Sequence, residues 1–480
     1  MVKRLARGYV RPYAGAIGGA LFFMIIAAAM TALFAKLIEP VLNNVLVDTN
    51  RDLILPAALG MFVCFLVRGG ATYIHTIIMN RVSQSIVADM QRDLFAAFVR
   101  LDLSFFHANP SGALVSRVLN DVEVVRQAIA GTFLGFGKSL LTLVFLIVLM
   151  FWQDWKLSLI ALVIFPFAAL FAAKIGRRLR KISKTLQAER GALGAVLTQI
   201  FQGIRQVKAY GAEGFEKERC GGVIDKVKGL NVKSVRVATL STPFNETLVG
   251  LAVMGIILYG GFQVMEGRQT AGALLSFIGA FALAYEPMKK LATLNNTLQT
   301  GLGAAERVFD MLDRVPAIQD REDAQILRTE EPEIRFDHVS FSYGGKDEPA
   351  LDDVSLVMAP GSVTALVGPS GGGKTTILNM IPRFYDPAAG AVRIDGADIR
   401  DLTLESLRAH AALVSQDITI FDDTVAANIA YGMSGATREA IESAAKAAAA
   451  DGFIAALPEG YETRLGEQGM TLSGGQRQRI

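Results

Sequence analysis

The chain is short of charged side chains. Asp, Glu, Lys and Arg make up 19% of its 480 residues, whereas an ordinary soluble domain contains about 25%. Hydrophobic residues make up 51%, and the mean hydropathy is +0.37. This composition argues against a wholly soluble protein and for a membrane protein. The net charge of +3 is too small to indicate nucleic acid as a partner.

Cysteine and histidine are also scarce, which argues against two kinds of site. The two cysteines, Cys64 and Cys220, are too few for a disulfide framework and do not have the spacing of a zinc site. The four histidines are scattered along the chain: His75, His107, His338 and His410. We therefore expect neither a disulfide scaffold nor a metal cluster.

Long apolar stretches are abundant in the first part of the chain. A helix needs about 20 apolar residues to cross a bilayer core of roughly 30 Å, since each residue advances about 1.5 Å. Six stretches qualify: 13–38, 53–78, 128–151, 157–175, 248–265 and 271–285. The first is too long for a cleaved signal peptide and is followed directly by a second span. We predict six membrane-spanning helices.

The positive charges indicate how these helices are oriented. The N-terminal segment and the segments 79–127 and 174–241 carry 24 Lys and Arg residues, and the three alternate loops carry three. Cytoplasmic loops retain such an excess. Both termini are therefore expected in the cytoplasm.

The long charged segments keep a helical pattern. Val82, Ile86, Met90 and Leu94 recur at helical spacing, which predicts that the membrane helices continue into the cytoplasm. The chain is expected to turn back at 107–112 and at 210–214. Helical hairpins that only pack on each other are the alternative interpretation.

A glycine-rich loop marks the second part of the chain. Residues 368–376 read Gly-Pro-Ser-Gly-Gly-Gly-Lys-Thr-Thr, between the apolar run 362–367 and the helix-like residues 377–380. This is the pattern GxxxxGK[ST] in its usual context of strand, loop and helix. Glycine N–H groups can surround phosphates, Lys374 supplies an ammonium group, and Thr375 offers a hydroxyl to Mg²⁺. We predict a buried strand at 362–367 and a site for ATP and Mg²⁺.

A second motif makes the assignment specific. Leu472-Ser473-Gly474-Gly475-Gln476 would by itself indicate only a turn. Together with the phosphate loop and the six spans, it resembles the ATP-binding cassette (ABC) exporters. From residue 37 to residue 478 the chain is most similar to the bacterial lipid A and phospholipid flippases of that family, for example at Ser104-Phe105-Phe106 and at Asp423-Thr424-Val425.

The resemblance implies a multi-domain fold. An all-α six-helix transmembrane domain at 1–304, with long cytoplasmic extensions, is followed by a linker at 305–332 and an incomplete α/β P-loop ATPase domain at 333–480. By the family pattern, the following residues contact nucleotide: Tyr343, Gly368, Ser370, Gly371, Gly373, Lys374, Thr375, Thr376, Ser473, Gly475 and Gln476. Tyr343 would stack on adenine. Lys374 and Gln416 would be catalytic, and Thr375 and Gln416 would contact Mg²⁺.

The resemblance also implies a functional unit of two chains, most simply a homodimer. Ser473 and Gly475 of one chain would face the γ-phosphate bound at Lys374 of the other. Cassette closure would be transmitted to the membrane helices through coupling residues. By the family pattern these are Phe106, Ala212 and Glu467.

Family members carry further motifs after the position that matches Ile480. These are the rest of the signature helix, a strand that ends in Asp-Glu, and a switch histidine. The two carboxylates complete the Mg²⁺ shell and polarise the attacking water. We therefore expect the 480 residues alone to hydrolyse ATP poorly, and the activity to belong to a longer parent protein.

Charged residues within the spans are candidates for substrate contact, because each costs about 2.5 to 3.5 kcal/mol at a helix centre. The resemblance implies that Arg68, Lys138 and Lys289 hold lipid phosphates, and structural pairing between helices is the alternative. Glu286 departs from the family by placing an acid where a base is expected.

The leading hypothesis is ATP-driven export or flipping of an amphipathic lipid across the bacterial inner membrane. The lipid would be lipid A, a lipopolysaccharide core or a phospholipid. A multidrug exporter of the same fold is the alternative. A nucleotide-gated channel or regulator is a remote third, because no span suggests a selectivity filter. The substrate headgroup and the identity of the second chain stay open.

Overall fold

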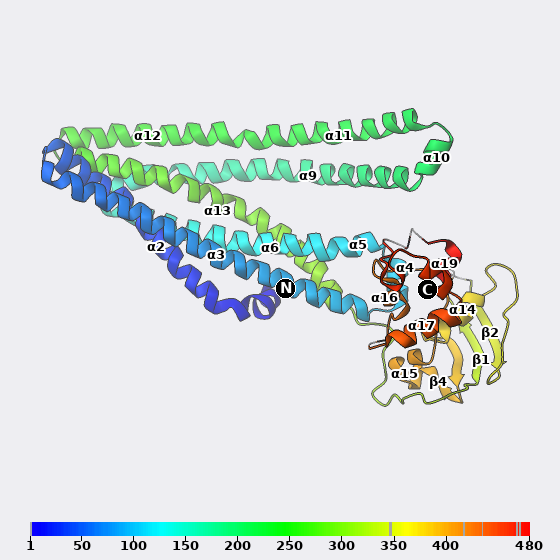
Figure 1. Ribbon diagram of the computed structural model, residues 1–480. Helices are drawn as coiled ribbons and strands as arrows, with labels where there is room; N and C mark the ends of the chain where they lie inside the picture. Colours follow the sequence, from blue (N-terminus) through cyan, green and yellow to red (C-terminus); the bar gives the residue numbers. More distant parts are fainter. Residues whose placement is uncertain (1, 345–347, 416–417, 434, 467–468, 470–471) are drawn as a thin grey trace. The chain divides into compact units, whose positions relative to one another are not determined.

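The computed structural model describes residues 2–344, 348–415, 418–433, 435–466, 469 and 472–480. They form two compact units. Unit 1 consists of Met1–Leu101 and Phe106–Val315, and unit 2 of Asp102–Phe105 and Pro316–Ile480. Figure 1 shows that unit 1 is made of long helices, whereas unit 2 combines a small sheet with short helices.

The helices of the first part of the chain follow one another with short connections. The α-helices are α1 (Val2–Leu5), α2 (Ala14–Pro40), α3 (Ile54–Arg100), α4 (Leu103–Ala108), α5 (Ser111–Ser116), α6 (Val122–Ala130), α7 (Gly137–Gln153), α8 (Trp155–Leu162), α9 (Ile164–Gln202), α10 (Ile204–Ala209), α11 (Glu213–Thr239), α12 (Ser241–Met265) and α13 (Ala271–Leu312). Turns of 3-10 or π-helix lie between them: η1 (Ala6–Val10), η2 (Arg11–Tyr13), η3 (Val41–Val47), η4 (Arg51–Leu53), η5 (Arg117–Asp121) and η6 (Gly131–Phe136).

Four helical stretches of the described chain are long and apolar enough to cross a membrane: Lys3–Val47, Arg51–Arg100, Glu213–Met265 and Ala271–Leu291. They contain the first, second, fifth and sixth predicted spans. The third predicted span corresponds to η6 and the shorter apolar helix α7. The fourth falls on α8 and the start of α9, where several side chains lie outside the described set.

The predicted cytoplasmic extensions are confirmed as helices. α3 continues to Arg100 and α9 to Gln202 before the chain turns. α13 likewise continues to Leu312, into the segment expected as a linker. Side chains fix where some helices begin: Asp154 caps α8 by accepting from the backbone N–H groups of Lys156 and Leu157, at 2.7 and 3.0 Å.

Apolar packing and a few polar contacts hold the helices of unit 1 together. A buried cluster joins α2, α7, α8, α12 and α13, with Leu146, Ile256 and Phe277 among its fully buried members. Within this region the Ser276 hydroxyl donates to the backbone oxygen of Ala35, at 2.7 Å. Such pairing satisfies polar groups that lipid cannot satisfy.

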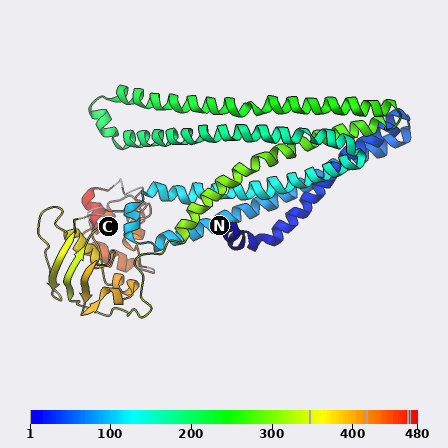
Figure 2. The same cartoon turned by 180° about the vertical axis from the view of Figure 1, so that it is seen from behind.

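Helices α9 and α11–α12 lie side by side as an antiparallel pair in both views (Figures 1 and 2). The rings of Phe171 and Phe244 stack at a centroid distance of 3.6 Å. Further along, the Arg190 guanidinium donates to the side-chain oxygen of Asn231 at 3.2 Å. These contacts define the register of the pair.

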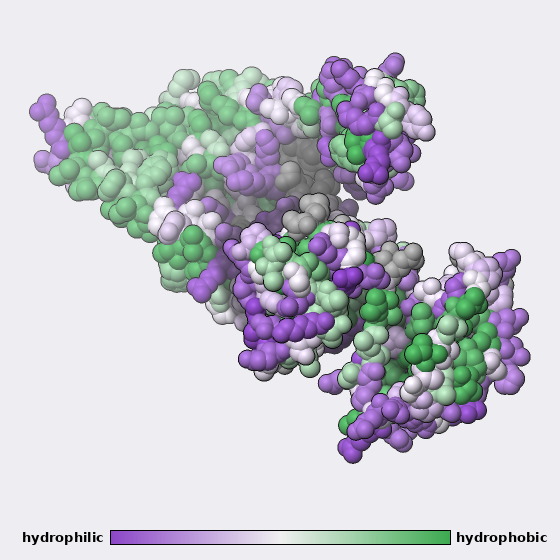
Figure 3. Space-filling view, turned by 45° about the vertical axis from the view of Figure 1, so that its right-hand side comes forward, coloured by the Kyte–Doolittle hydropathy of each residue, from purple (hydrophilic) through white to green (hydrophobic). Residues whose placement is uncertain are grey.

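Much of the surface of unit 1 is apolar. Large hydrophobic side chains on α2 and α3 are exposed, among them Phe22 at 60% and Phe62 at 62%. Figure 3 shows hydrophobic residues gathered in one broad region of the helical unit. An exposed apolar region of this extent marks a surface that contacts lipid.

Unit 2 contains the sheet and the remaining helices. Its strands are β1 (Ile334–Phe341), β2 (Leu351–Met358), β3 (Ala389–Ile394) and β4 (Ala397–Asp398). The α-helices that follow β2 are α14 (Lys374–Met380), α15 (Leu404–Ala409), α16 (Val425–Ile429), α17 (Arg438–Ala447), α18 (Asp451–Ala455) and α19 (Gly474–Arg479), and the 3-10 turns are η7 (Ile399–Asp401) and η8 (Gly460–Glu462).

The four strands form one antiparallel sheet in the order β2-β1-β3-β4. In β1, Phe336, Val339 and Phe341 turn toward a core that also contains Ile377 and Met380 of α14. A second core, around Val425, Ile454 and Leu472, holds the helices near the C-terminal end. The described residues of unit 2 therefore include two separate hydrophobic cores.

The predicted strand at 362–367 is wrong for this structure. The segment is not part of a described strand, and Val363 and Val367 are 101% and 93% exposed. An extended segment becomes a strand only when a neighbour pairs with its backbone groups. None of the described strands in unit 2 pairs with it.

Candidate functional site

The phosphate loop and the start of α14 form the centre of the candidate site. Gly371 and Gly373 have φ values of +85° and +78°, in the left-handed region that favours glycine. A Cβ atom at Gly373 would lie 2.6 Å from the backbone oxygen of Ala350 and 2.8 Å from Leu351 Cδ2. Position 373 therefore needs glycine for both its conformation and its space.

Lys374 holds the loop in its curved shape. Its Nζ donates to the backbone oxygens of Gly368 and Pro369, at 2.9 and 2.7 Å. Phosphate oxygens are stronger acceptors for an ammonium group than neutral carbonyls, so these contacts can be exchanged when an anion binds. Thr375 is exposed beside Lys374, whereas Thr376 is 5% exposed.

Tyr343 lies beside the loop helix α14. The Tyr343 hydroxyl donates to Thr376 Oγ1 at 3.1 Å. Its ring makes edge contacts with Phe341 and Tyr385, at centroid distances of 4.9 and 5.2 Å. Burial, the neighbouring Tyr343 and the Asp102 carboxylate raise the pKa of Tyr385.

The Ser-Gly-Gly-Gln motif begins helix α19. Ser473 Oγ accepts from the backbone N–H of Gln476 at 3.3 Å, and Gln476 Oε1 accepts from the backbone N–H of Ser473 at 2.8 Å. This is a reciprocal capping box. It gives Gln476 a structural role that was not among the sequence-based predictions. Gly475 is exposed on the first turn.

The phosphate loop and the signature segment pack into different cores. Ile377 and Met380 of α14 belong to the core of the sheet, whereas Leu472 belongs to the second core. Two of the predicted residues, Gln416 and Glu467, lie outside the described residues.

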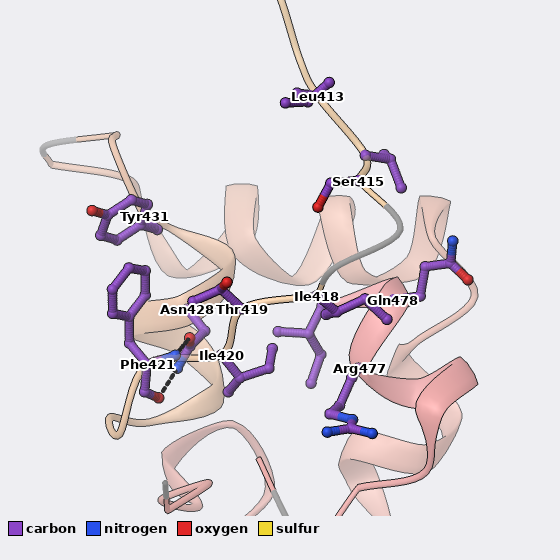
Figure 4. Close-up of a pocket in the computed structure, with 12 residues that line it drawn as sticks. Leu413, Ser415, Ile418, Thr419, Ile420, Phe421, Asn428, Tyr431, Arg477 and Gln478 are labelled. Atoms are coloured by element: carbon purple, nitrogen blue, oxygen red, sulfur yellow. Dashed lines mark hydrogen bonds between the residues drawn. The ribbon is translucent and has the colours of Figure 1, made fainter. Parts of the chain in front are cut away.

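A pocket of about 400 Å³ lies beside the signature helix. Figure 4 shows Ser415 and Ile418 on one side and Arg477 and Gln478 of α19 on another. Phe421 and Asn428 also line the pocket. The Asn428 side chain holds the Phe421 backbone in place, because its Nδ2 donates to the backbone oxygen of Phe421 at 3.0 Å. None of the residues that line the pocket belongs to the phosphate loop.

The two predicted cytoplasmic turns are present. Phe106 lies in α4 and is 39% exposed, and Ala212 directly precedes α11. The residues before Phe106 group with unit 2. There Leu103 packs against the core of the sheet, which sequence reasoning did not anticipate.

Asp102 holds the segment Asp102–Phe105 in place. Its Oδ1 accepts from the backbone N–H of Ala317 at 3.0 Å, and Ser104 also donates to its carboxylate. Burial favours a higher pKa for the Asp102 carboxyl, but the hydrogen bonds outweigh burial and leave the pKa below its usual range. Asp102 is therefore held as a carboxylate.

Two of the predicted substrate residues lie on helices that pack against α13, which carries Glu286. Arg68 of α3 and Lys138 of α7 are half-buried, and their charges act on Glu286 of α13. Lys290 lies one turn from Glu286, with its Nζ 2.7 Å from Glu286 Oε1. Lys289 is exposed on the same helix.

His75 is a polar residue that sequence reasoning did not single out. It lies on α3, two turns after Arg68, and is 2% exposed. Neither ring nitrogen has a hydrogen-bond partner among the described residues. Among the described residues, no group of three or more His, Cys, Asp or Glu could hold a metal ion.

Comparison with known proteins decides the family. The family pattern for the ABC transporter transmembrane region matches residues 17–288, and a second pattern, described as ABC transporter, matches residues 351–480. The chain belongs to the ABC transporter family. As in other members, a helical membrane domain precedes an ATPase domain that binds nucleotide. The predicted architecture is confirmed at this level.

Two curated relatives of this ABC transporter match it from end to end. It is 41% identical over 478 residues to the ATP-dependent lipid A-core flippase of Syntrophus aciditrophicus (strain SB), covering 100% of this chain and 79% of the relative. It is 40% identical over 480 residues to the flippase of the same name from Desulfotalea psychrophila (strain LSv54 / DSM 12343), covering 100% and 83%.

A solved structure supports the exporter architecture. A bacterial Atm1-family ABC exporter with ATP bound has a TM-score of 0.82 and 28% identity, covering 97% of this chain and 82% of that one. The transporter is thus a membrane-embedded ABC exporter, as the resemblance implied.

Proposed function

We propose that this ABC exporter moves an amphipathic lipid across the bacterial inner membrane at the expense of ATP. The observation that carries the proposal is end-to-end similarity to proteins named ATP-dependent lipid A-core flippases, at 40% and 41% identity. The excess of Lys and Arg in the segments expected in the cytoplasm supports cytoplasmic N- and C-termini.

In this proposal the loop at 368–376 binds the phosphates of ATP. Lys374 exchanges its two carbonyl partners for phosphate oxygens, and the left-handed glycines aim backbone N–H groups at them. Tyr343 lies next to the loop helix, where its ring can stack on adenine. Thr375 has an exposed hydroxyl suited to Mg²⁺, and Gln416 is assigned to the same ion by the family pattern.

Each ATP is shared between two chains in this proposal, most simply two copies of this one. The capping box leaves Ser473 and Gly475 exposed at the start of α19, so the Ser473 hydroxyl and the backbone N–H of Gly475 can approach an anion presented by another chain. Because both chains would contact the same ATP, its binding would hold the two cassettes together.

The cytoplasmic turns transmit this association to the membrane helices. Leu103 packs on the sheet core of the cassette, and Asp102 is tied to the backbone of Ala317. Phe106 follows on the same turn, and Ala212 lies at the second turn. We assign coupling to both turns, with Glu467 as a further family-based candidate.

The proposal is tested by reconstituting the full-length transporter in proteoliposomes with fluorescent lipopolysaccharide and phospholipids. ATP with Mg²⁺ should drive lipid movement, and Lys374→Ala should abolish it while the protein still folds. Equal lipid movement with and without ATP would contradict the proposal.

A multidrug exporter is the second candidate, and the exposed carboxylate of Glu286 favours it. Among the charges Arg68, Lys138 and Lys290, this acid weakens the attraction for a polyanion and suits a cation. Stronger stimulation of the ATPase by cationic drugs than by any lipid would select this alternative.

A further inference from the structure

Four charged side chains from three helices form a mixed-sign cluster within the membrane domain. Arg68 belongs to α3, Lys138 to α7, and Glu286 and Lys290 to α13. Helix α13 packs against both α7 and α3, and Lys290 Nζ lies 2.7 Å from Glu286 Oε1. The charges of Arg68, Lys138 and Lys290 all act on Glu286. The cluster therefore contains three positive charges and one negative charge.

The two ends of this cluster differ in exposure. Arg68 and Lys138 are half-buried between helices. The Glu286 and Lys290 side chains are 74% and 61% exposed, although both lie in the helical stretch that is apolar enough to span a membrane. Contact with lipid tails would be costly for such charges, so they are expected to face a water-filled cavity.

The ion pair between Glu286 and Lys290 shows that the Glu286 carboxylate can bind an ammonium group. Lys290 Nζ is a primary ammonium group that lies 2.7 Å from Glu286 Oε1. Exposed pairs at this helical spacing are weak. The Glu286 carboxylate thus already accepts a primary ammonium group, and a ligand ammonium group offers it the same chemistry.

We propose that this cluster binds a lipid headgroup that carries both a phosphate and a primary ammonium group. Arg68 and Lys138 hold the phosphate, and Glu286 holds the ammonium group in place of Lys290. This inference rests on the proposed lipid transport and names its substrate class. Phosphatidylethanolamine and lipid A that carries phosphoethanolamine both have this chemistry.

The test measures headgroup preference in proteoliposomes that contain the full-length transporter. Tail-labelled phosphatidylethanolamine and phosphatidylglycerol are compared as ATP-driven cargo. We expect a preference for the ethanolamine lipid of about 10-fold, the size typical of one charged hydrogen bond. Competition by lipid A with and without phosphoethanolamine then distinguishes the two sources of the headgroup.

Two variants separate ligand recognition from a structural ion pair. Glu286→Gln should reduce the preference to about one. Lys290→Gln removes the competing ammonium group and should keep or increase the preference. If the pair were only structural, both variants would have the same effect. Glu306→Gln, on an exposed part of the same helix, is the matched control and should change nothing.

The possible failures can be told apart. ATP-driven movement without headgroup preference, or with a preference that Glu286→Gln leaves intact, overturns the inference and leaves the proposed function standing. Absence of ATP-driven movement for every lipid overturns the proposed function itself. Apparent melting temperatures of the variants show whether each one folds.

Discussion

Gly301 of α13 lies against Ala128 of α6, and the two helices leave no room for a side chain at position 301. Ala128 is itself 7% exposed. The close contact joins two helices that are far apart in the sequence. Next to it, Leu5, Ile129 and Leu298 help to line an apolar cavity of about 140 Å³, so close packing at Gly301 borders a gap.

Gly301→Ala should destabilise the helical unit. The added methyl group would overlap Ala128 and force the helices apart, which typically costs about 1 to 3 kcal/mol. The matched control is Gly303→Ala, because a Cβ atom there meets nothing within 4 Å. This control should be neutral or stabilise by up to about 1 kcal/mol through helix propensity. Apparent melting temperatures in detergent compare the two, and equal values would refute the close contact.

Lys374→Ala should weaken ATP binding. The ammonium group is expected to contact phosphate oxygens, and loss of hydrogen bonds to charged groups costs about 1.5 to 3 kcal/mol, or roughly 10- to 100-fold in affinity. Titration with a fluorescent ATP analogue measures the change. Lys446→Ala, at an exposed position of α17, is the control. Comparable affinity in both variants would remove Lys374 from the site.

Two substitutions at Tyr343 separate its hydroxyl from its ring. Tyr343→Phe loses only the bond to Thr376 and should cost about 0.5 to 1.5 kcal/mol of stability with little change in nucleotide affinity. Tyr343→Ala also loses the aromatic surface, and its affinity for ATP should fall about 10-fold if the ring stacks on adenine. Nucleotide titration and thermal unfolding give the two readouts. An unchanged affinity in Tyr343→Ala would argue against stacking.

Asp398→Asn should change how stability depends on pH. Asp398 is 13% exposed, and Arg400 Nη2 lies 2.7 Å from its Oδ2. Burial favours a higher pKa for the Asp398 carboxyl, but hydrogen bonds from the Arg400 side chain and backbone prevail and lower it.

A lowered folded-state pKa means that the carboxylate stabilises the fold above its unfolded pKa of about 3.9 and that this stability is lost as the pH falls through the folded value. Asp398→Asn should therefore cost about 1 to 3 kcal/mol at neutral pH and progressively less below about pH 4. Thermal unfolding of the wild type and of Asp398→Asn, measured from neutral pH down to below about pH 4, gives the difference in stability at each pH. Asp422→Asn, at an exposed position, should show no such trend, and a constant cost for Asp398→Asn would refute the assignment.

Long runs of apolar residues made much of the helical unit predictable from the sequence. Runs of apolar residues revealed α2, α3, α12 and α13 because lipid imposes a minimum length on a spanning helix. Helical spacing of apolar residues likewise predicted that α3 continues beyond its membrane-spanning stretch. The phosphate loop was predictable because Gly371, Gly373 and Lys374 meet geometric demands that few other residues satisfy.

Features that depend on distant partners were not predictable. The apolar run 362–367 has the composition of a strand, but composition does not supply a neighbour for hydrogen bonding. Likewise, the contact of Leu103 with the sheet core and the bond from Ala317 to Asp102 join residues more than two hundred positions apart. The role of Gln476 in the capping box is local, and the Ser-x-x-Gln spacing was a usable signal for it.

The stacked rings of Phe171 and Phe244 have a mechanical consequence. From Phe171 to the end of α9 at Gln202, the helix advances about 45 Å at the standard rise. A pivot of about 5° at the aromatic stack therefore sweeps the far tip through about 4 Å. Slight repacking of two rings is thus magnified into a displacement that spin labels on Tyr210 and on a fixed helix could register.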